Sequence, residues 1–541
     1  MDGGGCASGG ESDPSRVPIH KECARPFTGM RSARHAFAGI VTLALAGHVA
    51  TMVYEITLAD RFGTGVEADA LALSFTMVVA VANEIAMWIS TLFIPRVIET
   101  ATKRGPAAAT RFFRRSLVIL VAGTSLLALA FVAVAAPLVS LLAPDPLVRE
   151  PSGHLARLFA PLLFLLPLSA LLAGSLHAQG RFALAGLRQL CWYGMTLASL
   201  VALSHPLGPS AVPLGMVLGL GSFCVILGGR LWFSGAGTAH TRPAVERAAE
   251  TRPLGAALLP LALASVANYV NVSIERGIAA RLPEGSLAAL TYAFRLLHFP
   301  VNLLLMNAAL VLLPSLAMHA AREEHEALEA LLARALRLTL VLTIPLAGLS
   351  MVLAQPVVEI LLERGAFTAH STMLTATALI FYGPGVIGIA GSQVLMRAYQ
   401  ALHEVRRLVV IGIAVIALNI ALMLILTHAL GFPGLPTAMS VSPTVLFVTM
   451  LAGLRRRLPG LDLGALGASA WRIVLAGVAA AASARALTAV VPEPQSLVLI
   501  IGGGGGLAAF CLALFCLSRD DARLALALIF PRLGRLAEGR S

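Results

Sequence analysis

The chain has 541 residues, of which 57% are hydrophobic and 13% are charged. Apolar runs long enough to cross a bilayer, about 18 residues or more, recur from His35 to Leu517, which excludes an ordinary soluble protein and indicates a polytopic helical membrane protein. The net charge of +12 does not indicate nucleic-acid binding, because the basic residues lie in short loops between apolar segments and act as topology signals.

The chain begins with a polar segment and continues as apolar spans. Residues 1–34 are rich in Gly, Ser, Pro and Arg and lack the apolar core of a cleavable signal, so we expect a disordered cytoplasmic tail. Fourteen transmembrane helices are predicted after it, at about 36–58, 70–95, 116–142, 155–178, 182–204, 208–233, 254–275, 286–318, 338–362, 372–396, 408–430, 433–454, 469–491 and 495–518.

The spans group into two lobes and an appendage. We expect an N-lobe of six helices in residues 35–234, a cytoplasmic linker over 235–252, and a C-lobe of six helices in residues 253–458. Residues 459–541 hold the last two helices and a cytoplasmic C-terminal tail. The predicted fold class is therefore an all-α polytopic membrane protein with two parallel-repeat six-helix lobes plus two C-terminal helices.

The distribution of basic residues orients these spans. Of the 40 Lys and Arg residues, seven fall on one side and Arg295 falls inside a span, which leaves 32 on the other side. Because the positive-rich side of an inner-membrane protein is cytoplasmic, both termini are expected in the cytoplasm. The seven on the outer side are Arg61, Arg149, Arg157, Arg276, Arg281, Arg364 and Arg485.

The two lobes resemble each other in sequence. Ala59-Asp60-Arg61 recurs as Ala279-Ala280-Arg281, and Ile94-Pro95 recurs as Leu313-Pro314. Six spans separate the copies, an even number, so the halves share one orientation and are related by an axis along the membrane normal. A substrate site is expected near the interface of the lobes.

Arg295 is the most informative residue of the chain. It lies about nine residues into the apolar segment from Ser286 to Met318, so about 14 Å deep at about 1.5 Å per residue. A charge at that depth costs about 2.5–3.5 kcal/mol on insertion scales and normally faces a polar cavity. Arg295 is predicted to bind an anionic group such as phosphate; the alternative is an internal ion pair with Glu84 or Glu55 that only ties the lobes together.

Other polar residues concentrate in spans one, two, seven and eight, which are equivalent pairs in the two lobes. For substrate binding we select Arg295, His298, Asn302, Asn83, Asn271 and Asp69, and for ion coupling Glu55, Glu84, His48 and Glu275. Asn268 and Asn307 are further cavity candidates. The asparagines have an alternative role as hydrogen-bonding links between helices, and Asp69 has one as the cap of span two.

No catalytic or metal motif accompanies these residues. The sequence has no Walker loop, nucleophile elbow or zinc-ligand spacing, so we expect a transporter with no catalytic residue, metal or cofactor. The six cysteines lack the spacing of a disulfide framework. Coupling to the membrane potential or to a cation gradient is the expected source of energy.

Several segments resemble the MurJ/MviN lipid II flippases of the MATE/MOP exporter superfamily. They are the stretch from Arg276 to Leu296 with Phe299-Pro300 and Leu312-Leu-Pro-Ser-Leu316, then Glu363-Arg-Gly-Ala-Phe367, Val394-Leu-Met-Arg-Ala-Tyr-Gln-Ala401, and Phe62-Gly63 through Asp69-Ala70. The resemblance covers most of the chain and is stronger in the second half. It implies two six-helix lobes around a central cationic cavity, a lipid-tail groove formed with the last two spans, and flipping of a polyprenyl-diphosphate-linked sugar.

The resemblance also assigns single residues. The family's cavity arginine of span eight falls on Arg295, and its acidic residue at the start of span two falls on Asp69. Its two arginines of span one align with His48 and Tyr54, and its arginine pair of span two falls near Val81-Ala82, so those cations are absent here. A cavity with fewer cations suits another polyprenyl-linked glycan, or relies on Arg295 and a loop arginine for the diphosphate.

We therefore predict a flippase that moves a lipid II-like peptidoglycan precursor across the bacterial inner membrane by alternating access. The alternatives are a flippase for another lipid-linked oligosaccharide such as O-antigen or exopolysaccharide, a cation-coupled multidrug exporter favoured by Glu55 and Glu84, and a non-transporting scaffold for envelope assembly. Expected partners are the lipid-linked glycan, membrane lipids and cell-wall synthesis machinery, with no nucleic acid.

Overall fold

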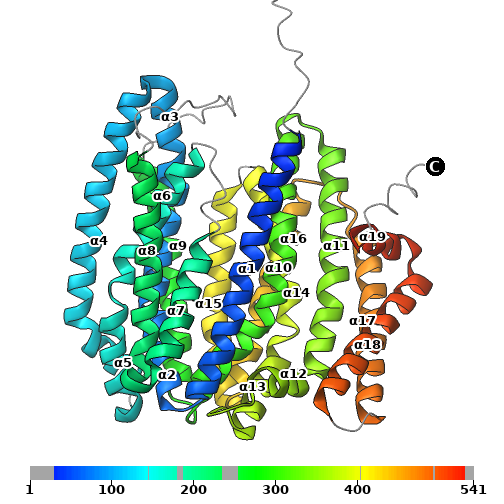
Figure 1. Ribbon diagram of the computed structural model, residues 1–541. Coiled ribbons are helices and arrows are strands. Elements are labelled where there is room, and N and C mark those ends of the chain that lie inside the picture. The colour runs from blue at the N-terminus through cyan, green and yellow to red at the C-terminus, as the bar shows by residue number, and fades with distance from the viewer. Residues whose placement is uncertain are drawn as a thin grey trace, which may run out of the picture.

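The chain folds into a bundle of long helices that run along a common axis (Figure 1). This computed structural model describes residues 30–143, 145–178, 187–233, 254–402, 404–490 and 494–529. The predicted tail before Met30, the linker over 235–252 and the tail beyond residue 529 lie outside these ranges. Every element in the described ranges is helical.

The first half of the chain contributes α1 to α8. They are α1 (Met30–Phe62), α2 (Val66–Trp88), the π-helical η1 (Ile89–Phe93), α3 (Ile94–Arg104), α4 (Pro106–Leu142), α5 (Pro146–Phe159), α6 (Leu162–Ala178), α7 (Leu187–Leu207), the 3-10 turn η3 (Gly208–Ser210) and α8 (Ala211–Phe233).

The second half contributes α9 to α16, followed by three further helices. They are α9 (Leu254–Ala279), α10 (Ser286–Ala321), α11 (His325–Val352), α12 (Ala354–Leu362), α13 (Ala369–Tyr382), α14 (Gly385–Ala401), α15 (Val405–Leu430) and α16 (Gly434–Arg455), then α17 (Leu463–Val490), α18 (Gln495–Leu517) and α19 (Arg519–Ile529). In Figure 1, α17 and α18 stand side by side at the edge of the bundle, beside α11.

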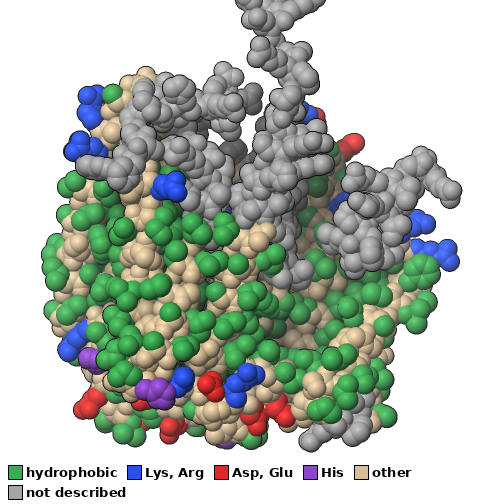
Figure 2. Space-filling model, viewed as in Figure 1, with side chains coloured by type: hydrophobic (Ala, Val, Ile, Leu, Met, Phe, Trp, Pro, Cys, Tyr) green, Lys and Arg blue, Asp and Glu red, His purple; other side chains and the backbone are tan. Residues whose placement is uncertain are grey.

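The helices are apolar enough for a membrane protein. Among the described residues, nine helical stretches are long and apolar enough to cross a bilayer, and the bent pair α13 and α14 makes a tenth, with an angle of 48° between its arms. Figure 2 shows a broad hydrophobic band with charged side chains gathered at its two ends. The chain is thus a multi-pass helical membrane protein, while the count of fourteen spans stays a prediction.

Local sequence explains where the helices begin and break. Asp145 caps α5, since its side chain accepts a hydrogen bond from the Leu147 N–H at 2.9 Å, and Pro146 occupies the first turn, where no N–H is needed. The predicted span over 155–178 is interrupted after Phe159, just before Pro161, so it is built from α5 and α6. The helix α1 begins at Met30, before the predicted end of the tail at residue 34.

The largest buried cluster joins the two halves. It combines side chains of the first half such as Leu73, Phe159 and Leu166 with side chains of the second half such as Leu290 and Tyr382. Two smaller clusters lie within the second half and around α17 and α18. We call the end of the bundle where α1 ends the predicted outer end, and the end where α1 begins the predicted cytoplasmic end.

Candidate functional site

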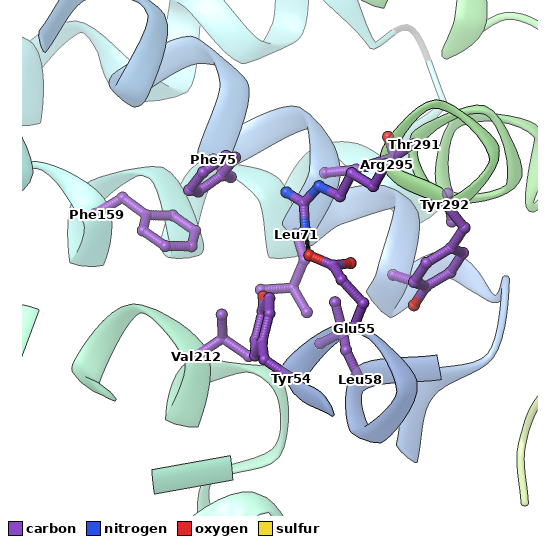
Figure 3. A pocket seen from close by; sticks show the side chains of 13 residues that line it. Tyr54, Glu55, Leu58, Leu71, Phe75, Phe159, Val212, Thr291, Tyr292 and Arg295 are labelled. Carbon is purple, nitrogen blue, oxygen red and sulfur yellow. Dashed lines mark hydrogen bonds and ion pairs between the residues drawn. The ribbon is translucent and has the colours of Figure 1, made fainter. Parts of the chain in front are cut away.

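A small cavity lies between the two halves (Figure 3). Its volume for water-sized groups is about 30 Å³, which is room for about two water molecules. The walls come from α1, α2, α5, α8 and α10 and consist of Tyr54, Glu55, Leu58, Ala68, Leu71, Ala72, Phe75, Phe159, Val212, Ala288, Thr291, Tyr292 and Arg295. The cavity is therefore mostly apolar, with its polar groups supplied chiefly by α1 and α10.

Arg295 and Glu55 meet in this cavity as an ion pair. Figure 3 shows the guanidinium of Arg295, from α10, directed at the carboxylate of Glu55, from α1. The side chains are 25% and 5% exposed, so the pair is largely shielded from solvent. The Arg295 guanidinium also lies over the Phe75 ring, 5.4 Å from its centroid. Arg295 thus links three helices, and Glu55 is the carboxylate that neutralises it.

The cavity retains unused hydrogen-bonding capacity. Among the described atoms, the Glu55 Oε2 oxygen and the Tyr292 hydroxyl are buried and lack a hydrogen-bond partner. Buried polar groups left in this state are costly. Both residues line the cavity, but these two atoms are themselves closed off from it, so a ligand reaches them only after the side chains move.

Asp69 closes the predicted outer end by capping a helix of the other half. Its Oδ2 accepts from the Gly285 N–H at 2.9 Å, and its Oδ1 accepts from the Ala288 N–H at 2.7 Å. Both donors lie at the start of α10, where free N–H groups and the helix dipole favour a carboxylate. Asp69 therefore caps α10, whereas the alternative drawn from the sequence was a cap on its own helix.

Two loop contacts extend this closure. The Ala366 N–H donates to the Asp60 carbonyl at 2.8 Å, and the hydroxyls of Thr64 and Ser371 lie 2.8 Å apart. Gly285 has φ +82°, and a Cβ there would lie 2.3 Å from the Thr64 carbonyl oxygen, so only glycine allows this approach. We call these contacts, with the two bonds to Asp69, the outer seal.

Glu84 and His48 contact helices of the second half, α9 and α10 respectively. Glu84 accepts hydrogen bonds from Ser265 and Asn268 of α9, so it is engaged by another helix. The His48 ring meets the Phe299 ring edge-on at 6.3 Å.

His298 faces its own helix. It donates through Nδ1 to the Phe294 carbonyl at 2.9 Å and stacks on the Phe294 ring.

The predicted asparagines divide into two groups. Asn419 donates to the Asn271 side chain at 2.8 Å and accepts from Ser442 at 2.7 Å, which links α9, α15 and α16. This is the interhelical role anticipated for Asn271. Asn83 and Asn302 are exposed, and Asn307 lies among residues whose side chains the structure does not describe.

Glu275 is buried beside Arg276, with 3.8 Å between Oε1 and the Arg276 Nη2. Arg276 in turn donates to the Thr291 hydroxyl at 3.1 Å, which connects this pair to a wall residue of the cavity. Within the described ranges, no group of three His, Cys, Asp or Glu side chains forms a metal-binding cluster. The roles proposed for Glu275 and for the other selected residues remain predictions.

Sequence reasoning missed several wall residues. Tyr292 and Thr291 line the cavity but look like ordinary apolar-span residues in sequence, whereas Tyr54 is marked in sequence only as the position of a family arginine that is absent here. The available signal was position: Tyr54 precedes Glu55, and Thr291 and Tyr292 lie within one helical turn of Arg295.

Comparison with known proteins agrees with this architecture. The family model described as lipid II flippase MurJ matches residues 58–500. A probable lipid II flippase MurJ of Rhizobium meliloti (strain 1021) is 26% identical over 431 residues, which cover 77% of this chain and 80% of the relative. The lipid II flippase MurJ of Burkholderia cenocepacia is 31% identical over 203 residues, covering 37% and 39% of the two chains.

Solved structures give the same fold. A lipid II flippase MurJ in an inward closed conformation matches with a TM-score of 0.72 and 17% identity, over 89% of this chain and 99% of that one. An inward-facing multidrug resistance MATE family transporter of the MOP superfamily matches with a TM-score of 0.64 and 15% identity, over 78% and 99%. Because the family model covers most of the chain, this protein belongs to the lipid II flippase MurJ family.

Proposed function

We propose that this protein flips a polyprenyl-diphosphate-linked peptidoglycan precursor, lipid II or a close relative, from the inner to the outer leaflet of the inner membrane. The observation that carries the proposal is the Arg295–Glu55 ion pair between the two halves, in the cavity of a chain that belongs to this family. The two halves would act as six-helix lobes that rock about the cavity, with both termini in the cytoplasm.

Arg295 would hold the diphosphate. A guanidinium offers a fork of N–H donors that matches phosphate oxygens, and Glu55 now occupies part of that fork. The Arg295–Glu55 pair carries no net charge, so it does not attract an anion while it is intact. The diphosphate would therefore replace the Glu55 carboxylate at the Arg295 guanidinium. Substrate binding would thereby break a contact between α1 and α10, and so loosen the two halves.

Glu55 provides a point for energy coupling. Once released from Arg295, its carboxylate would be a buried charge without a partner, which is unfavourable in a low-dielectric setting. A proton or a cation drawn from a gradient would neutralise it. The return of Glu55 to Arg295 would then favour release of the diphosphate at the other side.

The cavity must enlarge during transport. Its present volume of about 30 Å³ holds only a few atoms, so a sugar headgroup enters only if the halves separate. The outer seal is closed in this structure, with Asp69 bonded to α10. Opening toward the cytoplasm would admit substrate, and breaking of the outer seal would release it outside.

The test is a leaflet-accessibility assay for lipid II in cells depleted of the native flippase and supplied with variants. Arg295→Gln should lower flipping by about 100-fold or more, as expected for the loss of about 3 kcal/mol of charged hydrogen bonding to a diphosphate. Arg281→Ala is the matched control, because Arg281 is an exposed arginine of the loop that precedes α10. It should flip normally.

Folding is controlled with a second variant. Glu55→Gln with Arg295→Gln removes both charges together and should restore normal membrane levels without restoring flipping. Full flipping by either Arg295 variant would refute the assignment of Arg295. Normal lipid II exposure in depleted cells, with loss of a different surface glycan, would redirect the substrate to another lipid-linked oligosaccharide.

A further inference from the structure

A polar cluster joins α2 to α9 nearer the predicted cytoplasmic end than the cavity. Ser265 donates to the Glu84 Oε2 at 2.5 Å, and the Asn268 Nδ2 donates to the Glu84 Oε1 at 3.0 Å. The Trp88 indole N–H donates to the Ser265 hydroxyl at 2.9 Å. We call these four residues the Glu84 cluster. Glu84 and Trp88 belong to the first half, and Ser265 and Asn268 belong to the second.

The bonds of this cluster support one another. A serine hydroxyl has one proton and two lone pairs, so Ser265 can donate to Glu84 and accept from the Trp88 indole at the same time. Ser265 is only 6% exposed, which limits replacement of its own two bonds by water, whereas Asn268 is exposed. Both oxygens of the Glu84 side chain are therefore held by side chains of α9.

Two carboxylates of α2 hold the second half at different depths. Asp69 accepts from the backbone of α10 near the predicted outer end. Glu84 follows 15 residues later in the same helix, about 22 Å further along at about 1.5 Å per residue. A helix fastened at both points cannot tilt against the other half. One of the two attachments must break whenever the halves open at that end.

The helix becomes irregular directly after the cluster. The π-helical turn η1 (Ile89–Phe93) begins one residue after Trp88 and is followed by α3. Pro95 lacks a backbone N–H, so the helix loses one hydrogen bond at this point. Such irregular turns are places where helices bend. The Glu84 cluster thus lies between a regular helix and a potential hinge.

We propose that the Glu84 cluster is a latch that closes the two halves at the predicted cytoplasmic end, and that its release opens the cavity to substrate. The inference rests on the movement of the two halves that the proposed function requires. Asp69 and Glu84 then act as opposed fastenings on one helix: the outer seal holds while the latch is open, and the latch holds while the outer seal is open.

The experiment measures distances in the full-length protein, purified without substrate. Spin labels replace Arg111 at the start of α4 and Arg455 at the end of α16, both exposed and both at the predicted cytoplasmic end. The native cysteines are first replaced. Pulsed electron paramagnetic resonance then gives the populations of short and long distances for each variant.

Glu84→Ala removes both acceptors and should raise the ratio of long to short distances by about tenfold, as expected for two lost hydrogen bonds. Glu84→Gln keeps one acceptor oxygen and the shape of the side chain, so it should give a smaller rise. It also keeps the test valid if the alanine variant does not fold. Asn268→Ala should act in the same direction, and the effects of Asn268→Ala and Glu84→Ala should not add.

Glu99→Ala is the matched control. Glu99 is also a carboxylate of the first half, but its ion pair with Lys103, at 2.7 Å, lies within α3 and does not cross between halves. Its distance distribution should equal that of the parent protein. A folded Glu84→Gln variant with an unchanged distribution would overturn the latch.

This readout is independent of the substrate. If the Glu84 variants show longer distances but the protein does not flip lipid II, the latch is supported and lipid II is rejected as the substrate. If lipid II flipping depends on Arg295 but the Glu84 variants leave the distances unchanged, the proposed function is supported and the latch is rejected.

Discussion

At the scale of single residues, the Arg295–Glu55 pair makes a prediction about stability. Removing one partner leaves the other as a buried charge, which commonly costs about 3–5 kcal/mol, whereas replacing both can be nearly neutral. Since the Glu55 side chain is only 5% exposed, Arg295→Ala should lower the free energy of unfolding by about 3 kcal/mol. Glu55→Gln with Arg295→Gln should recover most of that loss.

Thermal unfolding of the purified full-length protein in detergent measures these differences, with Arg281→Ala as a control for the loss of an exposed arginine. A double variant as unstable as Arg295→Ala alone would mean that the two charges do not compensate each other. The same comparison distinguishes two roles of Arg295, a structural link between the halves and a substrate-binding residue. If Arg295 binds substrate, the double variant should be stable but inactive.

Gly285 makes a second prediction at this scale. Its φ of +82° is unfavourable for alanine, and a Cβ would lie 2.3 Å from the Thr64 carbonyl oxygen. Gly105 has nearly the same φ, +81°, but a Cβ there would meet nothing within 4 Å. Gly285→Ala should therefore loosen the outer seal, while Gly105→Ala should cost only backbone strain, about 1 kcal/mol.

A cysteine placed at Ala68, a buried wall residue of the cavity, reports the opening. In a background without native cysteines, a membrane-impermeant maleimide added outside should label it faster in Gly285→Ala than in Gly105→Ala. Equal labelling in the two variants would show that the close approach at Gly285 does not maintain the seal.

At the scale of elements, the glycine run of α18, from Gly502 to Gly506, gives that helix two different faces. A Cβ on Gly506 would lie 2.6 Å from Leu349 and 3.0 Å from the Ala480 carbonyl oxygen, whereas a Cβ on Gly504 would meet nothing within 4 Å. The run therefore has a packed face against α17 and α11 and an open face. Glycines of one short stretch therefore have different surroundings.

The resulting prediction compares these two faces. Gly506→Val should push α18 away from α17 and α11 and lower stability by about 1–3 kcal/mol, the usual cost of overpacking. Gly504→Val should be close to neutral, because valine on that face points into open space and raises helix propensity. Thermal unfolding of the whole protein measures both. Equal losses would attribute the effect to flexibility of the run rather than to packing.

Helices were predictable from sequence because bilayer thickness imposes long apolar segments. The predicted span over 286–318 lies within α10 (Ser286–Ala321), and its start at Ser286 coincides with the helix start after Gly285. The break between α5 and α6 was not predicted, since an apolar segment around Pro161 is compatible with a kink or with a new helix. Hydropathy records apolar length but not the path of the backbone.

At the scale of the whole molecule, the position of the site was predictable and its pairings were not. The internal repeat and the depth of Arg295 placed a cavity between the halves, where the structure has one. The sequence left Glu84 and Glu55 as equal partners for Arg295. Only the crossing of α1 against α10 brings Glu55 to Arg295 and places Glu84 against α9, and such crossings depend on side-chain packing over long sequence separations.

The topology of the molecule is the remaining prediction. Fourteen spans with both termini inside require α9 and α10 each to cross the membrane, and they contain 26 and 36 residues, about 39 Å and 54 Å of helix against about 30 Å of hydrocarbon. Residue Glu284, between them, should then lie outside, and Glu323, after α10, should lie in the cytoplasm. The excess of Lys and Arg residues in the loops on the predicted cytoplasmic side agrees with this arrangement.

Reporter insertions test it in intact cells. Alkaline phosphatase, which is active only outside the cytoplasm, should be active at Glu284 and inactive at Glu323, and a fluorescent protein that matures only in the cytoplasm should give the reverse pattern. Thr64, between α1 and α2, and Gly105, between α3 and α4, form the equivalent pair in the first half. If the second-half pair differed from the first-half pair, the two halves could not share one orientation. The parallel repeat would then be wrong, and with it the rocking of equivalent lobes about Arg295.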